Sequence, residues 1–300
     1  MSAFIDIIKD TDKPIVLVDL SWVLYKSNFI FTEDKFKTSK GEPNGHLLGF
    51  TNLLKTCYKL GYMTFICEDG HCAFRRELNE NYKANRNSKS FIKDTEIIEN
   101  LVNDLPNTYC VKNENYEADD LLYTLASLAW INKKEVYIHT ADKDLYQALG
   151  ENIHIASKIT LKQIDLIDEN SEQYTKNFPV PPEKLPIYRA FKGDVSDNLP
   201  AVVPGIRKEL LLQLVDYIAE HGNIKDFKVE KKSHEKYIKS LIENWNTFKT
   251  NYEIMKLNMV HFDLVEKVQE HKSIIEAHKF ELFGYEEFLR NILIYKGEWY

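Results

Sequence analysis

The chain has 300 residues and a net charge of −7, and hydrophobic residues make up 44% of it. This length suffices for one large domain or two ordinary ones with a substantial core. There is no run of about eighteen uncharged apolar residues, and the N-terminus lacks a basic segment followed by an apolar one, so we expect neither a membrane span nor a secretory signal. The four cysteines form no CxxC pair, which predicts free thiols in a reducing cytoplasm rather than disulfides or a zinc site.

The first half of the sequence alternates between short apolar runs and longer segments of helical periodicity. We predict strands at 14–20, 62–67, 108–111 and 135–140, and helices at 45–61 and 117–131. This alternation is typical of an α/β fold with a mostly parallel central sheet flanked by helices.

The pattern changes in a proline-rich segment at 178–186, which holds four of the nine prolines. Beyond it the predicted elements are helices, at 209–221, 233–258 and 285–295. We therefore place a boundary at about residue 185. It separates an α/β domain of residues 1–185 from a helical C-terminal region of residues 186–300.

Acidic residues follow three of the predicted strands directly. Asp19 ends the first strand, Asp69 follows the second beside Glu68, and Asp142 follows the fourth with Asp144 two residues later. Ligands of open α/β sheets bind beyond the carboxyl ends of the strands, so these acids should meet at one edge.

Further acids lie at a helix start, namely Glu117, Asp119 and Asp120, and in a predicted turn, namely Asp194 and Asp197. Taken separately, helix capping or turn formation explains them. Taken together, crowded carboxylates repel one another and require hard divalent cations, which indicates Mg²⁺ with Mn²⁺ as a substitute. Two or more such ions, roughly 3.5–4 Å apart, would suit phosphoryl transfer.

Residues 74–93 are strongly basic with interleaved aromatic residues. A solvated charged helix is one explanation, and a groove for a nucleic-acid backbone is the other. The cations of this stretch are Arg75, Arg76, Lys83, Arg86, Lys89 and Lys93, and its aromatic residues include Tyr82 and Phe91.

Six motifs follow one another along the chain: VDLSW (18–22), EDG (68–70), FRRELNENYKANR (74–86), YEADD (116–120), TADKDLYQ (140–147) and GDVSDNLPAVVPGI (193–206). In this order they resemble the motifs of the 5′-nuclease superfamily, which comprises flap endonucleases and the 5′→3′ exonucleases of bacterial DNA polymerases and phages. The length is similar to that of stand-alone phage or bacterial members. The resemblance implies a helical arch at about 73–95, which admits a free single-stranded 5′ end.

The resemblance also implies roles for individual residues. Asp19, Asp69, Glu117, Asp119 and Asp120 would form or support a first metal site, and Asp142, Asp144, Asp194 and Asp197 a second. Lys83 and Arg86 would approach the scissile phosphate as catalytic cations. Tyr82 would position the substrate strand, Arg75 and Arg76 would flank the arch entrance, and Lys89 and Lys93 would contact DNA.

The segment after Asp197 departs from the family pattern of a helix–hairpin–helix with two glycines. Pro204 and Gly205 are kept, but Arg207 replaces the second glycine, and its side chain hinders close backbone approach to a phosphate. We expect a degenerate helix–hairpin–helix in which Gly205, Arg207 and Lys208 contact DNA. The departure weakens the prediction of duplex anchoring and of a bound K⁺ ion.

The function implied is two-metal-ion hydrolysis of phosphodiester bonds at 5′ ends, flaps or RNA primers during DNA replication or repair. The expected partners are DNA with a free 5′ end, a 5′ flap or an RNA–DNA hybrid, and replication proteins such as a polymerase or single-strand-binding protein. We expect a monomer in the cytoplasm, the host's if a phage encodes it. The alternatives are a flap-DNA-binding module with weak catalysis and a related metal-dependent ribonuclease.

Overall fold

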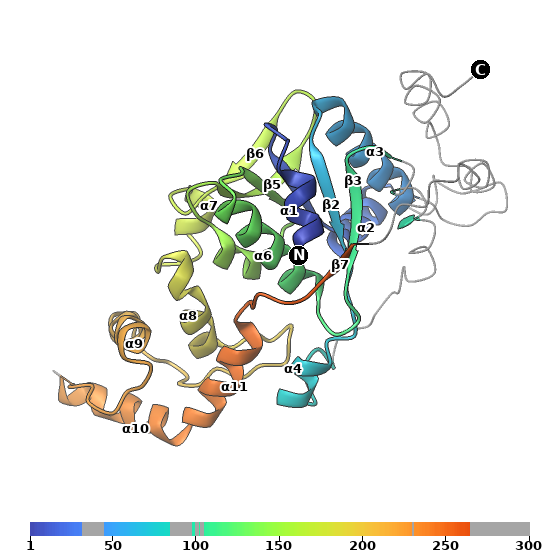
Figure 1. Ribbon diagram of the computed structural model, residues 1–300. Coiled ribbons are helices and arrows are strands. Elements are labelled where there is room, and N and C mark those ends of the chain that lie inside the picture. Colours follow the sequence, from blue (N-terminus) through green and yellow to red (C-terminus); the bar gives the residue numbers. More distant parts are fainter. Residues whose placement is uncertain (32–44, 85–97, 100–101, 103–104, 230, 265–300) are drawn as a thin grey trace, which may run out of the picture.

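A seven-stranded sheet forms the centre of the computed structural model, which describes residues 1–31, 45–84, 98–99, 102, 105–229 and 231–264 (Figure 1). The strand order is β6-β5-β4-β1-β2-β3-β7. The five strands from β5 to β3 are parallel, and β6 and β7 add antiparallel edges. The strands are β1 (Ile15–Asp19), β2 (Met63–Cys67), β3 (Thr108–Lys112), β4 (Val136–His139), β5 (Ile153–Ile159), β6 (Ile164–Ile167) and β7 (Asp263–Leu264).

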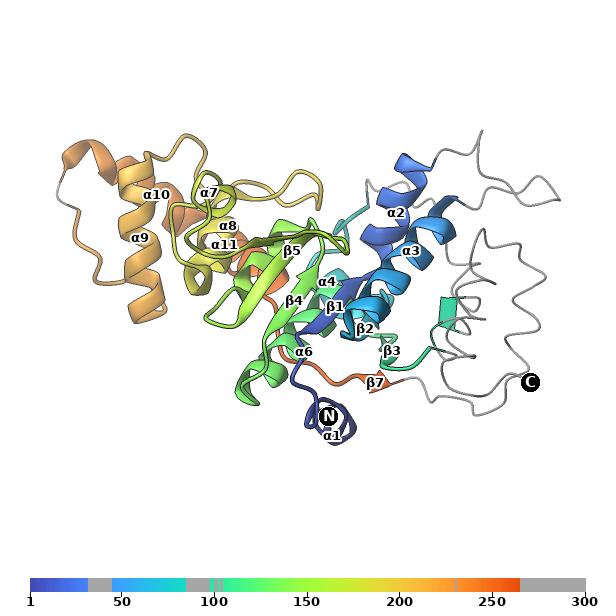
Figure 2. The same ribbon diagram turned by 90° about the horizontal axis from the view of Figure 1, so that it is seen from above.

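Helices cover both faces of the sheet, and a further group extends from one side of it (Figure 2). Around the sheet are α1 (Ser2–Ile8), α2 (Leu20–Ile30), α3 (Gly45–Leu60), α4 (Ala73–Leu78), α6 (Ala118–Ile131), η2 (Lys143–Ala148) and α7 (Glu172–Thr175). The later helices are η3 (Pro182–Lys184), α8 (Leu185–Lys192), α9 (Lys208–His221), η4 (Lys232–His234), α10 (Glu235–Glu243) and α11 (Trp245–Met255). No helix in these described ranges is long and apolar enough to cross a membrane.

Alternation along β1 divides the core into two layers. Ile15 and Leu17 belong to the cluster that contains the buried residues of α1 and α6, whereas Val16 and Val18 belong to the cluster with α2 and α3. All four side chains are fully buried because successive residues of a strand point to opposite faces and both faces are covered. The continuous apolar run in the sequence is therefore a central parallel strand.

The strand order places a topological switch between β1 and β4. From β1 the chain proceeds through β2 to β3 on one side, and β4 and β5 then occupy the other side. At such a switch the connections leave the sheet in opposite directions and open a crevice beyond the carboxyl ends of the strands. Asp19 ends β1, Asp69 lies two residues past the end of β2, and Asp142 lies three residues past the end of β4, so all three acids lie at this edge.

The predicted α/β architecture is confirmed, and the differences lie in individual elements. The four predicted strands and the two predicted helices of the first half are present within a few residues. The sequence patterns gave no indication of α1, α2, the inner strand β5 or the edge strands β6 and β7. The predicted helix at 285–295 and the arch beyond residue 84 lie outside the described residues.

The predicted single helix at 233–258 is wrong, because the chain forms η4, α10 and α11 instead. Asn244 separates α10 from α11, and its side-chain Nδ2 donates to the backbone oxygen of Ser240 at 2.9 Å. Short polar side chains compete with the helical backbone for hydrogen bonds and favour helix ends. Hydrophobic periodicity continues through the break, which is why the pattern alone missed it.

The chain returns to the sheet after the helical region, because Asp263–Leu264 pairs with Val111 and Lys112 of β3. The predicted boundary near residue 185 coincides with the start of α8. One hydrophobic cluster nevertheless includes Leu121 of α6, Phe191 of α8 and Phe248 of α11. The two parts share a core in this structure, and their division into domains stays a prediction.

Gly70 fixes the exit of β2 against the segment that leads into α6. Its N–H donates to the carbonyl of Tyr116 at 2.8 Å. A Cβ at Gly70 would lie 2.2 Å from the carbonyl oxygen of Asn113 and 2.6 Å from that of Tyr116. Both contacts are with backbone, which cannot rotate away.

We predict that Gly70→Ala lowers the free energy of unfolding by about 1–3 kcal/mol, the usual cost of overpacking. Urea denaturation followed by circular dichroism measures it. Gly150→Ala is the control, because a Cβ there meets nothing within 4 Å. Equal stability of the two variants would contradict the close approach at Gly70.

Candidate active site

A pocket of about 510 Å³ opens beyond the carboxyl ends of β1, β2 and β4. Five of the nine predicted metal-site acids line it, together with Lys83. The lining residues are Asp19, Ser21, Trp22, Asp69, Lys83, Asp119, Ala141, Asp142, Lys143, Arg189 and Asp194. Residues far apart in the sequence therefore meet at the edge that the strand-end argument predicted.

Asp19 is held by the start of α2 and by the end of β4. Its Oδ1 accepts from the backbone N–H of Trp22 at 2.9 Å, so it caps α2. Its Oδ2 accepts from the hydroxyl of Thr140 at 2.8 Å, and Thr140 Oγ1 accepts from the backbone N–H of Asp142 at 3.0 Å. Thr140 thus couples the acids on either side of the topological switch.

Asp69 joins β2 to α2 and α6. The Ser21 hydroxyl donates to its Oδ2 at 2.5 Å, and the backbone N–H of Ala118 donates to its Oδ1 at 2.9 Å. Ala118 is the first residue of α6, where N–H groups lack helical partners and the helix dipole favours negative charge. Asp69 is therefore oriented by α2, which Asp19 caps, and by α6, which carries Asp119.

Mutual repulsion and burial raise the pKa of the central acids. Burial, followed by the charge of Asp69, raises the pKa of Asp19 to about 7. Burial, followed by the charges of Asp142 and Asp19, raises the pKa of Asp119 well above its ordinary value. Such carboxylates gain more than isolated ones when a cation neutralises them.

Arg189 partly neutralises the negative charge of Asp144 and Asp194, on the side of the pocket formed by η2 and α8. Its Nη2 contacts Asp194 Oδ2 at 2.7 Å, and its Nη1 forms an ion pair with Asp144. Asp194 Oδ1 also accepts from the backbone N–H and the hydroxyl of Ser196. Burial alone would raise the pKa of Asp194, but Ser196 and the charge of Arg189 outweigh it and lower that pKa.

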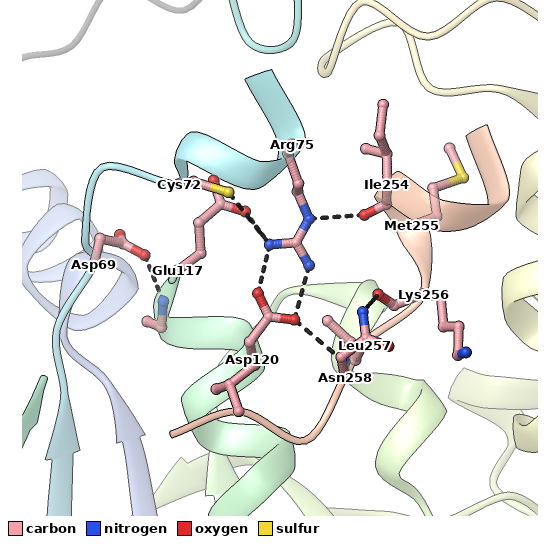
Figure 3. A network of polar contacts seen from close by, with 12 residues as sticks. Asp69, Cys72, Arg75, Glu117, Asp120, Ile254, Met255, Lys256, Leu257 and Asn258 are labelled. Atoms are coloured by element: carbon pink, nitrogen blue, oxygen red, sulfur yellow. Dashed lines mark hydrogen bonds and ion pairs between the residues drawn. The ribbon is translucent and has the colours of Figure 1, made fainter. Parts of the chain in front are cut away.

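Glu117 and Asp120 are not among the residues that line the pocket, and both extend toward Arg75 (Figure 3). Both oxygens of Asp120 accept from the guanidinium, at 2.5 and 2.9 Å, and Glu117 Oε2 accepts at 3.1 Å. Arg75 Nε donates to the carbonyl oxygen of Ile254 at 2.8 Å. The Arg75 side chain is only 2% exposed, so in this structure its donors face protein groups. The predicted DNA contact of Arg75 and the metal-site roles of the two acids stay predictions.

The base of the predicted arch is anchored beside this network. Lys83 Nζ donates to Glu117 Oε1 at 2.5 Å while lining the pocket. The Tyr82 hydroxyl donates to Glu117 Oε2 at 3.0 Å, and its ring is buried in a small cluster with Leu199 and Ile254. The Lys83 backbone N–H donates to the carbonyl oxygen of Asp197, a buried residue outside the pocket lining.

The remaining predicted residues lie apart from the pocket. Arg86, Lys89 and Lys93 lie outside the described residues. Arg76 is exposed on α4. Gly205 has a φ of 71° and is exposed in the loop between α8 and α9, and exposed Arg207 and Lys208 begin α9. The helix–loop–helix is therefore present, whereas DNA contacts there stay predictions.

The sequence patterns did not single out five pocket residues, namely Ser21, Trp22, Ala141, Lys143 and Arg189. Ser21 and Trp22 lie within the VDLSW motif, so their proximity to Asp19 was a usable signal. Arg189 lies five residues before Asp194 in a segment that otherwise resembles an ordinary amphipathic helix. Only the packing of α8 against the sheet part brings it to the acids.

The donor set of the pocket fits hard divalent cations. Its five acidic residues supply oxygen ligands only, as Mg²⁺ and Mn²⁺ prefer. Among the described residues, no three acidic, histidine or cysteine side chains are already arranged around a common point as ligands. Binding therefore requires the carboxylates to move closer together than they are in this structure.

Comparisons with known proteins agree with this geometry. A family model described as the 5′-3′ exonuclease, N-terminal resolvase-like domain, matches residues 14–177. A 5′-3′ exonuclease of Buchnera aphidicola is 30% identical over 78% of this chain and 76% of its own length. The thermostable DNA polymerase I of Thermus filiformis is 32% identical over 73% of this chain, but over only 25% of its own length.

Solved structures share the fold at low identity. The T5 D15 protein, co-crystallized with metal ions, matches with a TM-score of 0.61 and 17% identity, covering 94% of this chain and 98% of that one. The catalytic core of Rad2 in complex with DNA substrate matches with a TM-score of 0.53 and 18% identity, covering 97% and 98%.

This chain belongs to the 5′-3′ exonuclease family. It spans 20–25% of the length of the first DNA polymerase I relatives that it matches. The family membership predicted from the motifs is thus confirmed.

We predict that Arg75→Ala lowers the free energy of unfolding by about 3–5 kcal/mol, because it leaves buried carboxylates without their cation. Equilibrium urea unfolding measures the loss. Arg76→Ala is the matched control: it removes the adjacent, exposed arginine and should change stability by less than about 0.5 kcal/mol. If the two substitutions had similar effects, Arg75 would not be the cation that stabilises the buried carboxylates of Asp120 and Glu117.

The raised pKa of Asp19 predicts a pH-dependent stability of the protein in chelator. Between pH 4 and about pH 7 the folded state retains a proton that the unfolded state has lost, so stability falls as pH rises through this window and levels off above it. Asp19→Asn should flatten this dependence and be more stable than the native protein at pH 8. Asp226→Asn, at an exposed position, should leave the curve unchanged.

Urea midpoints measured from pH 4.5 to pH 8 provide the test. An Asp19→Asn variant whose slope equals that of the native protein would show that the pKa of Asp19 is not raised in the folded state.

Proposed function

We propose that this protein is a divalent-metal-dependent 5′-nuclease that hydrolyses phosphodiester bonds of DNA at free 5′ ends or 5′ flaps. The observation that carries the proposal is the pocket in which five aspartates from three strand ends, α6 and the loop after α8 meet beside Lys83. The family, whose model is described as a 5′-3′ exonuclease domain, supports it.

The residues that would hold two divalent cations fall into two groups. Asp19, Asp69 and Asp119 lie on the β1–β2–α6 side, and Asp142, Asp144 and Asp194 on the η2–α8 side. When bound, such cations would activate water for attack and neutralise charge on the phosphate and the leaving oxygen. The hydroxyls of Ser21 and Thr140 would keep Asp69 and Asp19 oriented.

Lys83 places a positive charge beside the acids of the pocket. Its ammonium lies at the pocket wall on Glu117, and burial would by itself lower its pKa, but the charges of Glu117 and Asp119 outweigh that and raise it. The group therefore stays protonated at neutral pH. We propose that it donates to a non-bridging oxygen of the scissile phosphate as negative charge develops.

The substrate class is inferred from the surroundings of the pocket and from the neighbours. The Rad2 core was solved with DNA substrate, and the T5 D15 flap endonuclease with DNA and metal ions. In this chain, exposed Arg76, Arg207 and Lys208 are suited to contact phosphates without reading bases. We propose flap or nicked DNA, or an RNA–DNA hybrid at a primer, in replication or repair.

We predict that Asp142→Asn reduces cleavage of a 5′-labelled flap in Mg²⁺ by roughly hundredfold or more, because a ligand and its charge are lost. Flap binding in chelator should stay within about threefold of the native protein, since phosphate contacts dominate affinity. Product lengths on denaturing gels and fluorescence anisotropy measure the two effects. Asp226→Asn should cleave like the native protein.

Two outcomes would contradict the proposal. The native protein could fail to cleave flap, nicked and blunt duplexes in both Mg²⁺ and Mn²⁺. Cleavage could persist in excess chelator. A native protein that binds flap DNA but cleaves none of these substrates would instead be a binding module.

A further inference from the structure

Arg189 occupies an unusual position for a cation in this pocket. It lies on α8, lines the pocket, and contacts Asp144 and Asp194, which come from η2 and from the loop after α8. The Arg189 side chain is 13% exposed, and those of the two acids are 16% and 23% exposed. The three groups thus form a largely enclosed ion triplet at the rim of the acidic cluster.

In this triplet, Arg189 contacts carboxylate oxygens that could also bind a metal ion. Asp194 directs Oδ2 to Arg189 and Oδ1 to Ser196, while Asp144 directs Oδ1 to Arg189. A guanidinium placed between two carboxylates supplies one positive charge, where a divalent cation would supply two. A guanidinium and a divalent cation at the same two carboxylates repel each other, so occupancy by one weakens occupancy by the other.

Arg189 differs from Arg75 in a way that makes it displaceable. Arg75 is buried, donates to Asp120, Glu117 and the carbonyl oxygen of Ile254, and does not line the pocket. Arg189 reaches the pocket surface, whereas the next residues, Ala190 and Phe191, are buried and hold α8 in place. Its side chain can leave the acids without any movement of the helix.

We propose that Arg189 is a built-in counter-cation that occupies the η2–α8 side of the acidic pocket and competes directly with a divalent cation there. Arg189 is a positioning residue. It holds the carboxylates of Asp144 and Asp194 together when no divalent cation is bound, and it thereby weakens the binding of such a cation. This inference rests on the proposed function, because it assumes that these acids take a divalent cation.

The test is a Mn²⁺-binding isotherm in the absence of DNA, from the electron paramagnetic resonance signal of free Mn²⁺. Arg189→Gln should tighten one class of Mn²⁺ site by about tenfold, the range expected when a charged hydrogen bond no longer competes. Arg189→Lys keeps the charge and should bind Mn²⁺ nearly as weakly as the native protein. Lys192→Gln removes an exposed cation from the same helix and is the control.

A second measurement covers the possibility that Arg189→Gln folds poorly. In chelator its thermal midpoint should be lower than that of the native protein, and saturating Mn²⁺ should raise it by more than it raises the native midpoint. A merely structural arginine would lower the midpoint equally with and without Mn²⁺.

The outcomes separate this inference from the proposed function. Weaker or unchanged Mn²⁺ binding in Arg189→Gln, in a native protein that binds Mn²⁺ and cleaves flap DNA, would overturn the competition alone. Equal tightening in Lys192→Gln would also overturn it, because the effect would then be one of general charge. Absence of both Mn²⁺ binding and cleavage in the native protein would overturn the proposed function itself.

Discussion

Repulsion among carboxylates at one edge of the sheet is the constraint that the rest of the structure satisfies. Parallel strands deliver Asp19, Asp69 and Asp142 to the same crevice, and α6 adds Asp119 at its first turn. Burial strengthens the repulsion, because a low dielectric screens like charges poorly. Burial first, and then the charges of the neighbouring aspartates, raise the pKa values of Asp19 and Asp119. A fold that maintains this cluster must supply positive charge from elsewhere.

That charge comes from segments outside the sheet. Arg75 of α4 neutralises Asp120 and Glu117, Lys83 at the arch base reaches Glu117, and Arg189 of α8 reaches Asp144 and Asp194. All of these acids except Asp194 come from the α/β part, whereas the cations lie on α4, just after α4 and on α8, which flank the sheet. These ion pairs link the segment at Lys83 and the helix α8 to the sheet part. Under the proposed function, the same acids that hold these segments would bind metal ions.

The sequence was most informative where chemistry and local structure coincide. Acids after buried strands could be placed at one edge from strand direction alone, and the pocket contains them. Arg75 and Arg76 are adjacent and chemically identical, yet one is buried and the other exposed, which depends on how α4 packs against α6 and α11. Arg189 gave no signal because its acid partners include Asp144, 45 residues away in sequence. Long-range packing, not residue type, decides such contacts.

The segment from Ile254 to Val260 shows how far this coupling extends. Its backbone bonds to side chains of three elements that surround the acids: Ile254 to Arg75 of α4, Met255 and Leu257 to Gln147 of η2, and Asn258 and Val260 to Asp120 and Thr124 of α6. Figure 3 shows the part of this network around Arg75. The segment leads from α11 back to β7, so the helical region is tied to the sheet through the supports of the acidic pocket. A shift of α11 would therefore disturb the hydrogen bonds that Arg75 makes with Ile254 and with Asp120.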